Sequence, residues 1–181
     1  MILFLAGASH TGKTLLAQRL MERYHIPYLS IDHLKMGLIR SGQTSLTPMD
    51  DDKLTDYLWP ILREMVKTAI ENNQSLIVEG CYIPFDWAKD FPPEYLRHIR
   101  YRCLIMTRSY IEHHFDRIRC FASAIEQRLN DSDLTPDRLI RENEENLRQC
   151  REHGCGYILI ENDYCIVPEE VIGDDPLFII E

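Results

Sequence analysis

Short runs of apolar residues recur along the chain, and longer stretches between them carry apolar residues at helical spacing. Five runs have the continuous apolar character of strands that are buried on both faces: residues 2–6, 28–32, 75–80, 101–106 and 157–162. Helical periodicity follows over residues 13–24, from Leu54 to Ala69 and from Ile111 to Leu129, and a further helix is expected to open at Thr135 and Pro136. Pro60 lies inside the second helical stretch, where we expect a kink or a restart.

This alternation of strands and helices predicts an α/β fold. Right-handed crossovers between successive strands would give a parallel five-stranded sheet with helices on both faces. A chain of 181 residues is long enough for one domain, residues 1–181, and short for two. Ligands of such sheets bind beyond the carboxyl ends of the strands. Polar residues follow each of the five runs at that edge: the octet 7–14, then Asp32, then Glu79, then Thr107 with Arg108, then Asn162 with Asp163.

Composition and charge narrow the class of partner. Hydrophobic residues make up 45% and charged residues 27% of the chain, as in ordinary globular proteins. No apolar run approaches the ~20 residues that span a membrane, and the first run is too short and lacks a basic flank for a signal peptide. The net charge of −9 disfavours general attraction to nucleic acid or anionic membranes. We therefore expect a cytoplasmic protein without nucleic-acid or membrane partners.

The six cysteines follow no disulfide-scaffold spacing, so free thiols are expected. Cys150, His153 and Cys155 are of the types that bind zinc, but a second pair of ligands is missing. A helix end followed by Gly154 and Gly156 is the favoured interpretation of this segment.

The octet GASHTGKT, residues 7–14, matches G-x-x-x-x-G-K-[ST] and lies between a predicted strand and a predicted helix. Gly7 and Gly12 permit backbone angles that turn successive N–H groups around a phosphate. Lys13 would reach the β- and γ-phosphates, and the Thr14 hydroxyl would hold Mg²⁺. The alternative is a simple glycine turn with a solvated lysine. The octet predicts binding of ATP through its eight residues: Gly7, Ala8, Ser9, His10, Thr11, Gly12, Lys13 and Thr14.

Two acidic residues at neighbouring strand ends point to phosphoryl transfer. Glu79 has the position from which such proteins hold the metal, although a surface acid is common there too. Asp32 could accept the proton of an acceptor hydroxyl, or it could serve as the N-cap of the helix that follows. Both roles of Asp32 can coexist.

The segment after the fourth strand supplies cations around a polar break, NDSDLTP. Its arginines are Arg108, Arg117, Arg119, Arg128, Arg138 and Arg141. Phosphoryl transfer needs cations at the migrating group and exclusion of water, so a helical lid over about residues 115–138 is expected. Helical spacing prevents all of these arginines from sharing one face. We expect one or two of Arg117, Arg119 and Arg128 to be catalytic, with a fixed hairpin of exposed ion pairs as the alternative.

Together these motifs resemble the P-loop kinases of nucleotides and small metabolites: adenylate, shikimate, gluconate and zeta-toxin-like kinases. The chain is most similar to 2-phosphoglycerate kinase, through SID at 30–32, VEGCYIP at 78–84, HHFDRIR at 113–119 and LIEND at 159–163. The segment CYIPFDW departs from that family, and the chain is shorter. The resemblance implies a substrate-binding segment at about residues 33–70 and a three-layer fold with a helical lid.

The function predicted on these grounds is that of an ATP- and Mg²⁺-dependent kinase acting on a small hydroxylated, anionic metabolite such as a phosphoglycerate-like acid. Asp32, Arg40 and Glu79 would contact the acceptor, Thr14 and Glu79 the metal, and Asn162 and Asp163 the nucleobase. A nucleotide kinase is one alternative, in which Phe85 or Trp87 would stack on a base, although core packing of these aromatics is favoured. An ATP-binding regulatory module with incidental hydrolysis is another. A monomer or a homodimer is expected.

Overall fold

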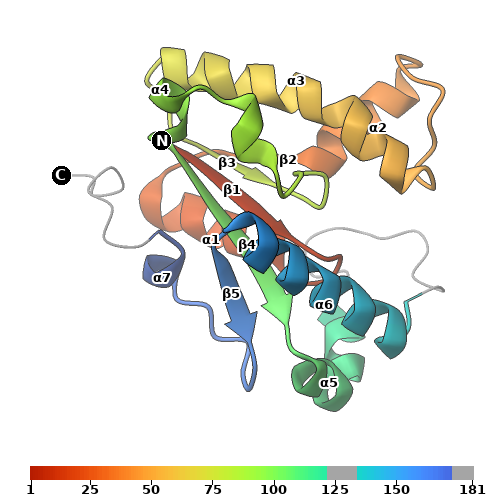
Figure 1. Cartoon of the computed structure of the whole chain (residues 1–181). Coiled ribbons are helices and arrows are strands. Elements are labelled where there is room, and N and C mark those ends of the chain that lie inside the picture. Colours follow the sequence, from red (N-terminus) through yellow and green to blue (C-terminus); the bar gives the residue numbers. More distant parts are fainter. Residues whose placement is uncertain (122–133, 173–181) are drawn as a thin grey trace.

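The computed structural model describes residues 1–121 and 134–172, and its centre is a five-stranded sheet of order β2-β3-β1-β4-β5. β1 (Ile2–Gly7) lies in the middle between β3 (Leu76–Glu79) and β4 (Ile99–Met106), and β2 (Tyr28–Ser30) and β5 (Tyr157–Ile160) form the edges. Every neighbouring pair is parallel. The predicted parallel sheet is confirmed, and its carboxyl ends lie along one edge (Figure 1).

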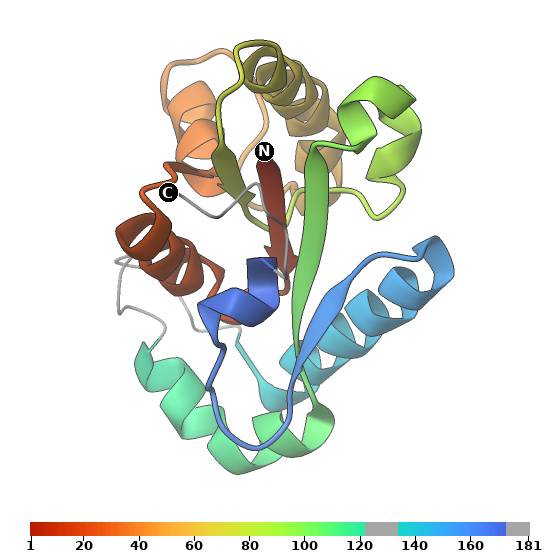
Figure 2. The ribbon, with the colours of Figure 1, turned by 90° about the vertical axis from the view of Figure 1, so that its left-hand side faces the viewer.

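Helices cover both faces of the sheet (Figures 1 and 2). One face carries α1 (Lys13–Tyr24), α5 (Arg108–Phe121) and α7 (Pro168–Ile172), while α2 (Ile31–Arg40) and α3 (Asp51–Glu71) lie on the other. The 3₁₀ helix η1 (Trp87–Asp90) and the short α4 (Pro93–Leu96) precede β4. α6 (Pro136–His153) supplies residues to the cores on both sides. The three-layer α/β prediction is confirmed.

Side chains of the sheet alternate between two apolar cores. Leu3 and Leu5 of β1 point into the core under α1, whereas Ile2, Phe4 and Ala6 point into the core under α3. Because both faces are covered, the strand has no polar positions, and all six of its residues are buried. Each fully buried large aliphatic side chain contributes about 1.5–3 kcal/mol relative to exposure. This explains the continuous apolar runs of the sequence.

Several predicted boundaries differ from the structure. β2 stops at Ser30, because the chain turns there into α2, whose first residue Ile31 is fully buried under the sheet. α3 continues through Pro60 without restarting. β5 stops at Ile160, so Asn162 lies in the loop beyond it. The helix predicted from Ile111 to Leu129 begins at Arg108 and is described to Phe121; its remainder, with Arg128 and Asn130 to Asp133, lies outside the described residues.

No helix in residues 1–121 and 134–172 combines the length and apolar character that crossing a membrane requires. This finding agrees with the absence of a long apolar run in the sequence.

A buried asparagine ties α6 to the carboxyl end of β4. Asn143 is 1% exposed, its Oδ1 accepts from the Met106 amide at 2.8 Å, and its Nδ2 donates to the Leu139 carbonyl at 2.8 Å. Asn143→Leu is expected to lower the free energy of unfolding by about 1–3 kcal/mol, because the Met106 N–H is left buried and unpaired. Urea titration measures the loss. Gln149→Leu, on the same helix but partly exposed, is the control, and equal stability of both variants would contradict the role of Asn143.

Candidate active site

The octet forms a tight turn between β1 and α1. Three of its residues adopt positive φ: Gly7 at 143°, His10 at 67° and Gly12 at 79°. A Cβ on Gly7 would lie 2.6 Å from the Leu104 carbonyl oxygen, and one on Gly12 would lie 2.0 Å from the Tyr164 hydroxyl. Both glycines are therefore required by close approach as well as by backbone angle. The structure brings all eight predicted residues of the loop together.

The start of α1 is open to an anion. Gly12 is its N-cap, no side chain caps it, and no acidic residue lies in the first turn. The first N–H groups of a helix have no partner within the helix, and they carry partial positive charge. A phosphate at this end would accept hydrogen bonds from them.

Lys13 is folded back over the loop. The residue is 7% exposed, and its Nζ donates to the Ala8 carbonyl at 2.8 Å. The Thr11 hydroxyl donates to the same carbonyl at 2.9 Å. The ammonium is thus held inside the loop at the place where phosphate oxygens would compete for it.

Thr14 and Glu79 form a pair that suits Mg²⁺. The Thr14 hydroxyl donates to Glu79 Oε1 at 3.2 Å, and Glu79 is 2% exposed at the end of β3. Ser30 is the register partner of Glu79, and its buried hydroxyl has no hydrogen-bond partner. Mg²⁺ prefers oxygen ligands, keeps several waters and needs only one or two protein ligands. The donor set and the orphaned hydroxyl therefore fit a hydrated Mg²⁺ held by Thr14 and Glu79.

Asp32 lies in the first turn of α2, and Ser30 is the N-cap, so the interpretation of Asp32 as the N-cap is wrong. The carboxylate forms an ion pair with Lys35, one helical turn away. Lys35 Nζ also donates to the Tyr82 hydroxyl at 3.0 Å, and that hydroxyl donates to Asp51 Oδ1 at 2.7 Å. Residues of α2, of the loop after β3 and of the start of α3 thus form one chain of polar contacts.

Sequence reasoning missed Lys35, Tyr82 and Asp51. The spacing of three between Asp32 and Lys35 is a signal for an ion pair on a helix, but no local pattern joins Tyr82 to them. Arg40, the predicted acceptor cation, is exposed at the other end of α2, eight residues or about 12 Å along the axis from Asp32. The structure therefore brings Lys35, and not Arg40, against Asp32.

The predicted lid arginines that the structure describes lie on α5. Arg117 and Arg119 are exposed, and the Arg117 guanidinium lies 5.8 Å from the centroid of the Phe121 ring. Arg108 instead pairs with Glu144 of α6 at 2.8 Å, and Arg138 pairs with Glu142 at 2.7 Å. Arg108 and Arg138 thus form surface ion pairs, and the spacing indicated that some arginines of the segment would do so. Arg117 and Arg119 remain candidates for a catalytic role.

The loop after β5 reaches the phosphate loop. Asn162 and Asp163 are exposed, and the next residue, Tyr164, donates its hydroxyl to the Thr11 carbonyl at 3.0 Å. Burial raises the pKa of Tyr164 above its ordinary value, so its hydroxyl stays protonated and remains a donor. This contact places the predicted nucleobase loop beside the octet.

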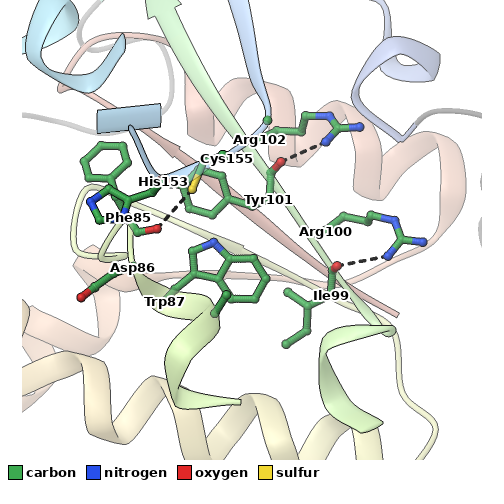
Figure 3. A pocket seen from close by; sticks show the side chains of 12 residues that line it. Phe85, Asp86, Trp87, Ile99, Arg100, Tyr101, Arg102, His153 and Cys155 are labelled. Atoms are coloured by element: carbon green, nitrogen blue, oxygen red, sulfur yellow. Dashed lines mark hydrogen bonds between the residues drawn. The ribbon is translucent and has the colours of Figure 1, made fainter. Parts of the chain in front are cut away.

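A cavity of about 410 Å³ lies at the opposite end of the strands, beside the amino ends of β4 and β5 (Figure 3). Trp87 stacks on Tyr101 with a centroid separation of 6.0 Å and packs edge-on against Phe4 at 5.4 Å, and Phe85 packs against Tyr101 at 6.4 Å. Core packing of Phe85 and Trp87 is confirmed. Because ligands of parallel sheets bind at the carboxyl ends, the cavity is not the candidate active site.

Cys150, His153 and Cys155 lie near the same amino ends of β4 and β5. Cys150 is buried, and the Cys155 thiol donates to the Phe85 carbonyl at 3.2 Å. Burial and the neighbouring Cys150 raise the pKa of Cys155 to about 11, which keeps it protonated at neutral pH. α6 ends here at His153, and its C-cap Gly154 lies in the left-handed region, so the favoured interpretation of a helix end is confirmed.

No known family profile matches the chain, and no curated protein matches its sequence significantly. Its fold does match solved structures. A protein from Chloroflexus aurantiacus, provisionally described as a kinase, shares 17% identity over 94% of this chain and 91% of its own, with a TM-score of 0.53. A shikimate kinase from Bacteroides thetaiotaomicron shares 16% identity over 91% of this chain and 90% of its own, with a TM-score of 0.47. A gluconokinase from Sinorhizobium meliloti shares 13% identity over 94% of this chain and 86% of its own, with a TM-score of 0.46. At 17% identity the match to the Chloroflexus aurantiacus protein speaks for the fold alone: the chain shares its three-layer α/β fold.

Proposed function

We propose that the protein is an ATP- and Mg²⁺-dependent kinase that transfers a phosphoryl group to a hydroxyl of a small molecule. One observation carries this proposal: the loop and the segment that leads into Asp32 both adjoin Glu79 at the end of β3. Thr14 of the octet contacts Glu79, and Glu79 pairs in register with Ser30, two residues before Asp32. A phosphate cradle and a carboxylate that can receive a proton therefore share one edge of the sheet.

The reaction follows from these positions. The loop amides and Lys13 hold the triphosphate, and Asp32 accepts the proton of the acceptor hydroxyl. The acceptor oxygen forms a bond to the γ-phosphorus while the bond from that phosphorus to the bridging oxygen of ADP breaks. When bound, Mg²⁺ neutralises charge on the phosphates, and Thr14 and Glu79 would hold it. Asn162 and Asp163 would lie near the base, and residues 33–70 would form the acceptor side.

The acidic acceptor expected from the sequence depended on Arg40. Since Arg40 lies far from Asp32 along α2, the expected contact between Arg40 and the acidic group of a phosphoglycerate-like acceptor is not supported. The similarity to 2-phosphoglycerate kinase stays a prediction. The nucleotide-kinase alternative has also lost support, because Phe85 and Trp87 pack at the far edge of the sheet.

The experiment for this proposal follows labelled γ-phosphate from MgATP into a panel of small hydroxyl compounds and nucleosides. Transfer to a small non-nucleotide acceptor supports it. Saturable transfer to a nucleoside monophosphate would favour the nucleotide-kinase alternative. ATP binding without transfer, with hydrolysis stimulated by a protein partner, would indicate a regulatory module instead.

The lid arginines give a separate prediction. Arg117→Ala or Arg119→Ala is expected to lower turnover by ~10²–10³, as loss of one preorganised charge at a transition state does, with ATP affinity nearly unchanged. Arg128→Ala tests the third candidate in the same way. Steady-state kinetics and ATP titration separate the two quantities. Arg148→Ala, which removes a surface ion pair on α6 with Glu145, is the control. Wild-type turnover in all three lid variants would mean that this segment only packs.

A further inference from the structure

The ammonium of Lys35 is a nearly buried charge beside the proposed proton acceptor. Its side chain is 12% exposed, its Nζ pairs with Asp32 and donates to the Tyr82 hydroxyl, and the ring of Tyr82 lies 4.9 Å from it. A lysine ammonium has three N–H donors. The third has no partner among the side chains that the structure describes. Lys35 can therefore donate one more hydrogen bond, next to the carboxylate that would face the acceptor hydroxyl.

Tyr82 and Asp51 also hold Lys35 in place. The Tyr82 hydroxyl accepts from Lys35 and donates to Asp51 at 2.7 Å, so its direction is fixed. Burial, with the hydrogen bond to Asp51, raises the pKa of Tyr82, which stays neutral. A lysine fixed by two partners loses little side-chain entropy when it binds a third.

A second polar atom near Asp32 also lacks a partner. Ser30 is 2% exposed, and its hydroxyl makes no hydrogen bond. Buried hydroxyls are nearly always paired, so one without a partner points to a ligand or a water. Ser30 lies two residues before Asp32 and beside Glu79 in the sheet register. Lys35 and Ser30 therefore both have hydrogen-bonding capacity near Asp32 in the chain, and a water bound to Ser30 could serve the proposed Mg²⁺ site as well.

The charges around Lys35 disfavour an acidic ligand. Among the described residues, Asp32 and Asp51 supply two carboxylates against the one ammonium of Lys35. Lys53 of α3 is exposed and lies 3.6 Å from Asp50, and Arg40 is exposed, five residues or about 7.5 Å along the axis of α2 from Lys35. An ammonium that is already neutralised adds little attraction for an anion, whereas its free N–H still binds a hydroxyl oxygen.

We propose that Lys35 binds an oxygen of the acceptor beside the hydroxyl that is phosphorylated, and that the acceptor is an uncharged polyhydroxy compound, a polyol or a sugar. Tyr82 and Asp51 are positioning residues for Lys35. This inference rests on the proposed kinase activity. In the transfer, the acceptor oxygen bonds to the γ-phosphorus, its proton passes to Asp32, and ADP leaves with the bridging oxygen.

Two matched series of acceptors test the charge. Glycerol, glycerate and 2-phosphoglycerate form the first, and glucitol, gluconate and 6-phosphogluconate form the second, each offered with MgATP. We expect the highest kcat/KM for the uncharged member of a series. A higher value for the carboxylate or the phosphate would overturn the inference while leaving the kinase intact.

A metabolite extract covers acceptors outside these series. The labelled products of γ-labelled ATP are separated by anion exchange, and mass spectrometry of each labelled product gives the formula, and with it the charge, of its parent acceptor. Neutral parent acceptors support the inference. Acidic parent acceptors contradict the inference but leave the proposed kinase activity standing. If no labelled product forms from the extract or the two series, the proposed function falls and the inference falls with it.

Variants test the residues with the acceptor that these assays yield. Lys35→Met, which keeps the length of the side chain, is expected to raise the acceptor KM at least 10-fold and to change the KM for ATP less than threefold. Tyr82→Phe keeps the ring and removes the hydroxyl, so a smaller rise is expected. Lys53→Met is the matched control. An unchanged acceptor KM in Lys35→Met and Tyr82→Phe, with folding verified by circular dichroism, would overturn the assignment.

Discussion

Lys13→Ala is expected to abolish detectable phosphoryl transfer and to weaken ATP binding. A charge-assisted hydrogen bond contributes about 1.5–3 kcal/mol, and loss of one charge that stabilises a transition state costs ~10²–10³ in turnover. Lys13 is the nearest cation to the open start of α1, where its Nζ is held by the Ala8 carbonyl. Isothermal titration with ATP and the transfer assay measure the two losses separately.

The fold is expected to survive this change. The Ala8 carbonyl keeps the hydrogen bond from the Thr11 hydroxyl at 2.9 Å, so no buried acceptor is left unpaired. Lys13→Met, which preserves most of the side-chain volume, should show the same functional loss with an even smaller change in melting temperature. Arg23→Ala, an exposed residue of α1, is the control. Wild-type turnover of Lys13→Ala would remove the nucleotide site from the proposed function.

The phosphate loop was predictable because its chemistry is local. Eight consecutive residues carry the glycines, the lysine and the hydroxyl, and the strand and the helix around them have clear periodicity. The sheet was predictable for a similar reason, since strands buried on both faces need continuous apolar runs. Glu79 was predictable because parallel strands end at a common edge, so a strand-end acid must lie near the loop.

The acceptor side was less predictable because its contacts join distant segments. Tyr82 and Asp51 are 31 residues apart, and Tyr82 lies 47 residues from Lys35. The spacing of three between Asp32 and Lys35 is compatible with an ion pair, but the prediction of Arg40 rested on its distance of one or two helical turns from Asp32 and not on a contact. The length of β2 was also misjudged, because Ile31 is apolar in sequence whether it continues a strand or, as here, opens a helix onto the same core.

Asp32→Asn is expected to lower turnover by ~10²–10⁴, the range typical of a positioned proton acceptor, with ATP affinity nearly unchanged. Asparagine keeps the size of the side chain but cannot take the proton of the acceptor hydroxyl.

A structural role predicts a different result. The Asp32 carboxylate is 38% exposed in its ion pair with Lys35 and lies at the positive end of α2. An exposed ion pair contributes about 0–1 kcal/mol, and removal of one partner of a buried pair costs about 3–5 kcal/mol. The nearly buried ammonium of Lys35 puts this pair between the two cases, so a stability loss of about 1–4 kcal/mol is expected. Thermal melting and kinetics on the same sample, with Asp56→Asn on the exposed face of α3 as the control, distinguish the roles. A stability loss in this range with wild-type turnover would leave Asp32 as a partner of Lys35 only, and the proton acceptor would then have to be sought elsewhere at this edge of the sheet.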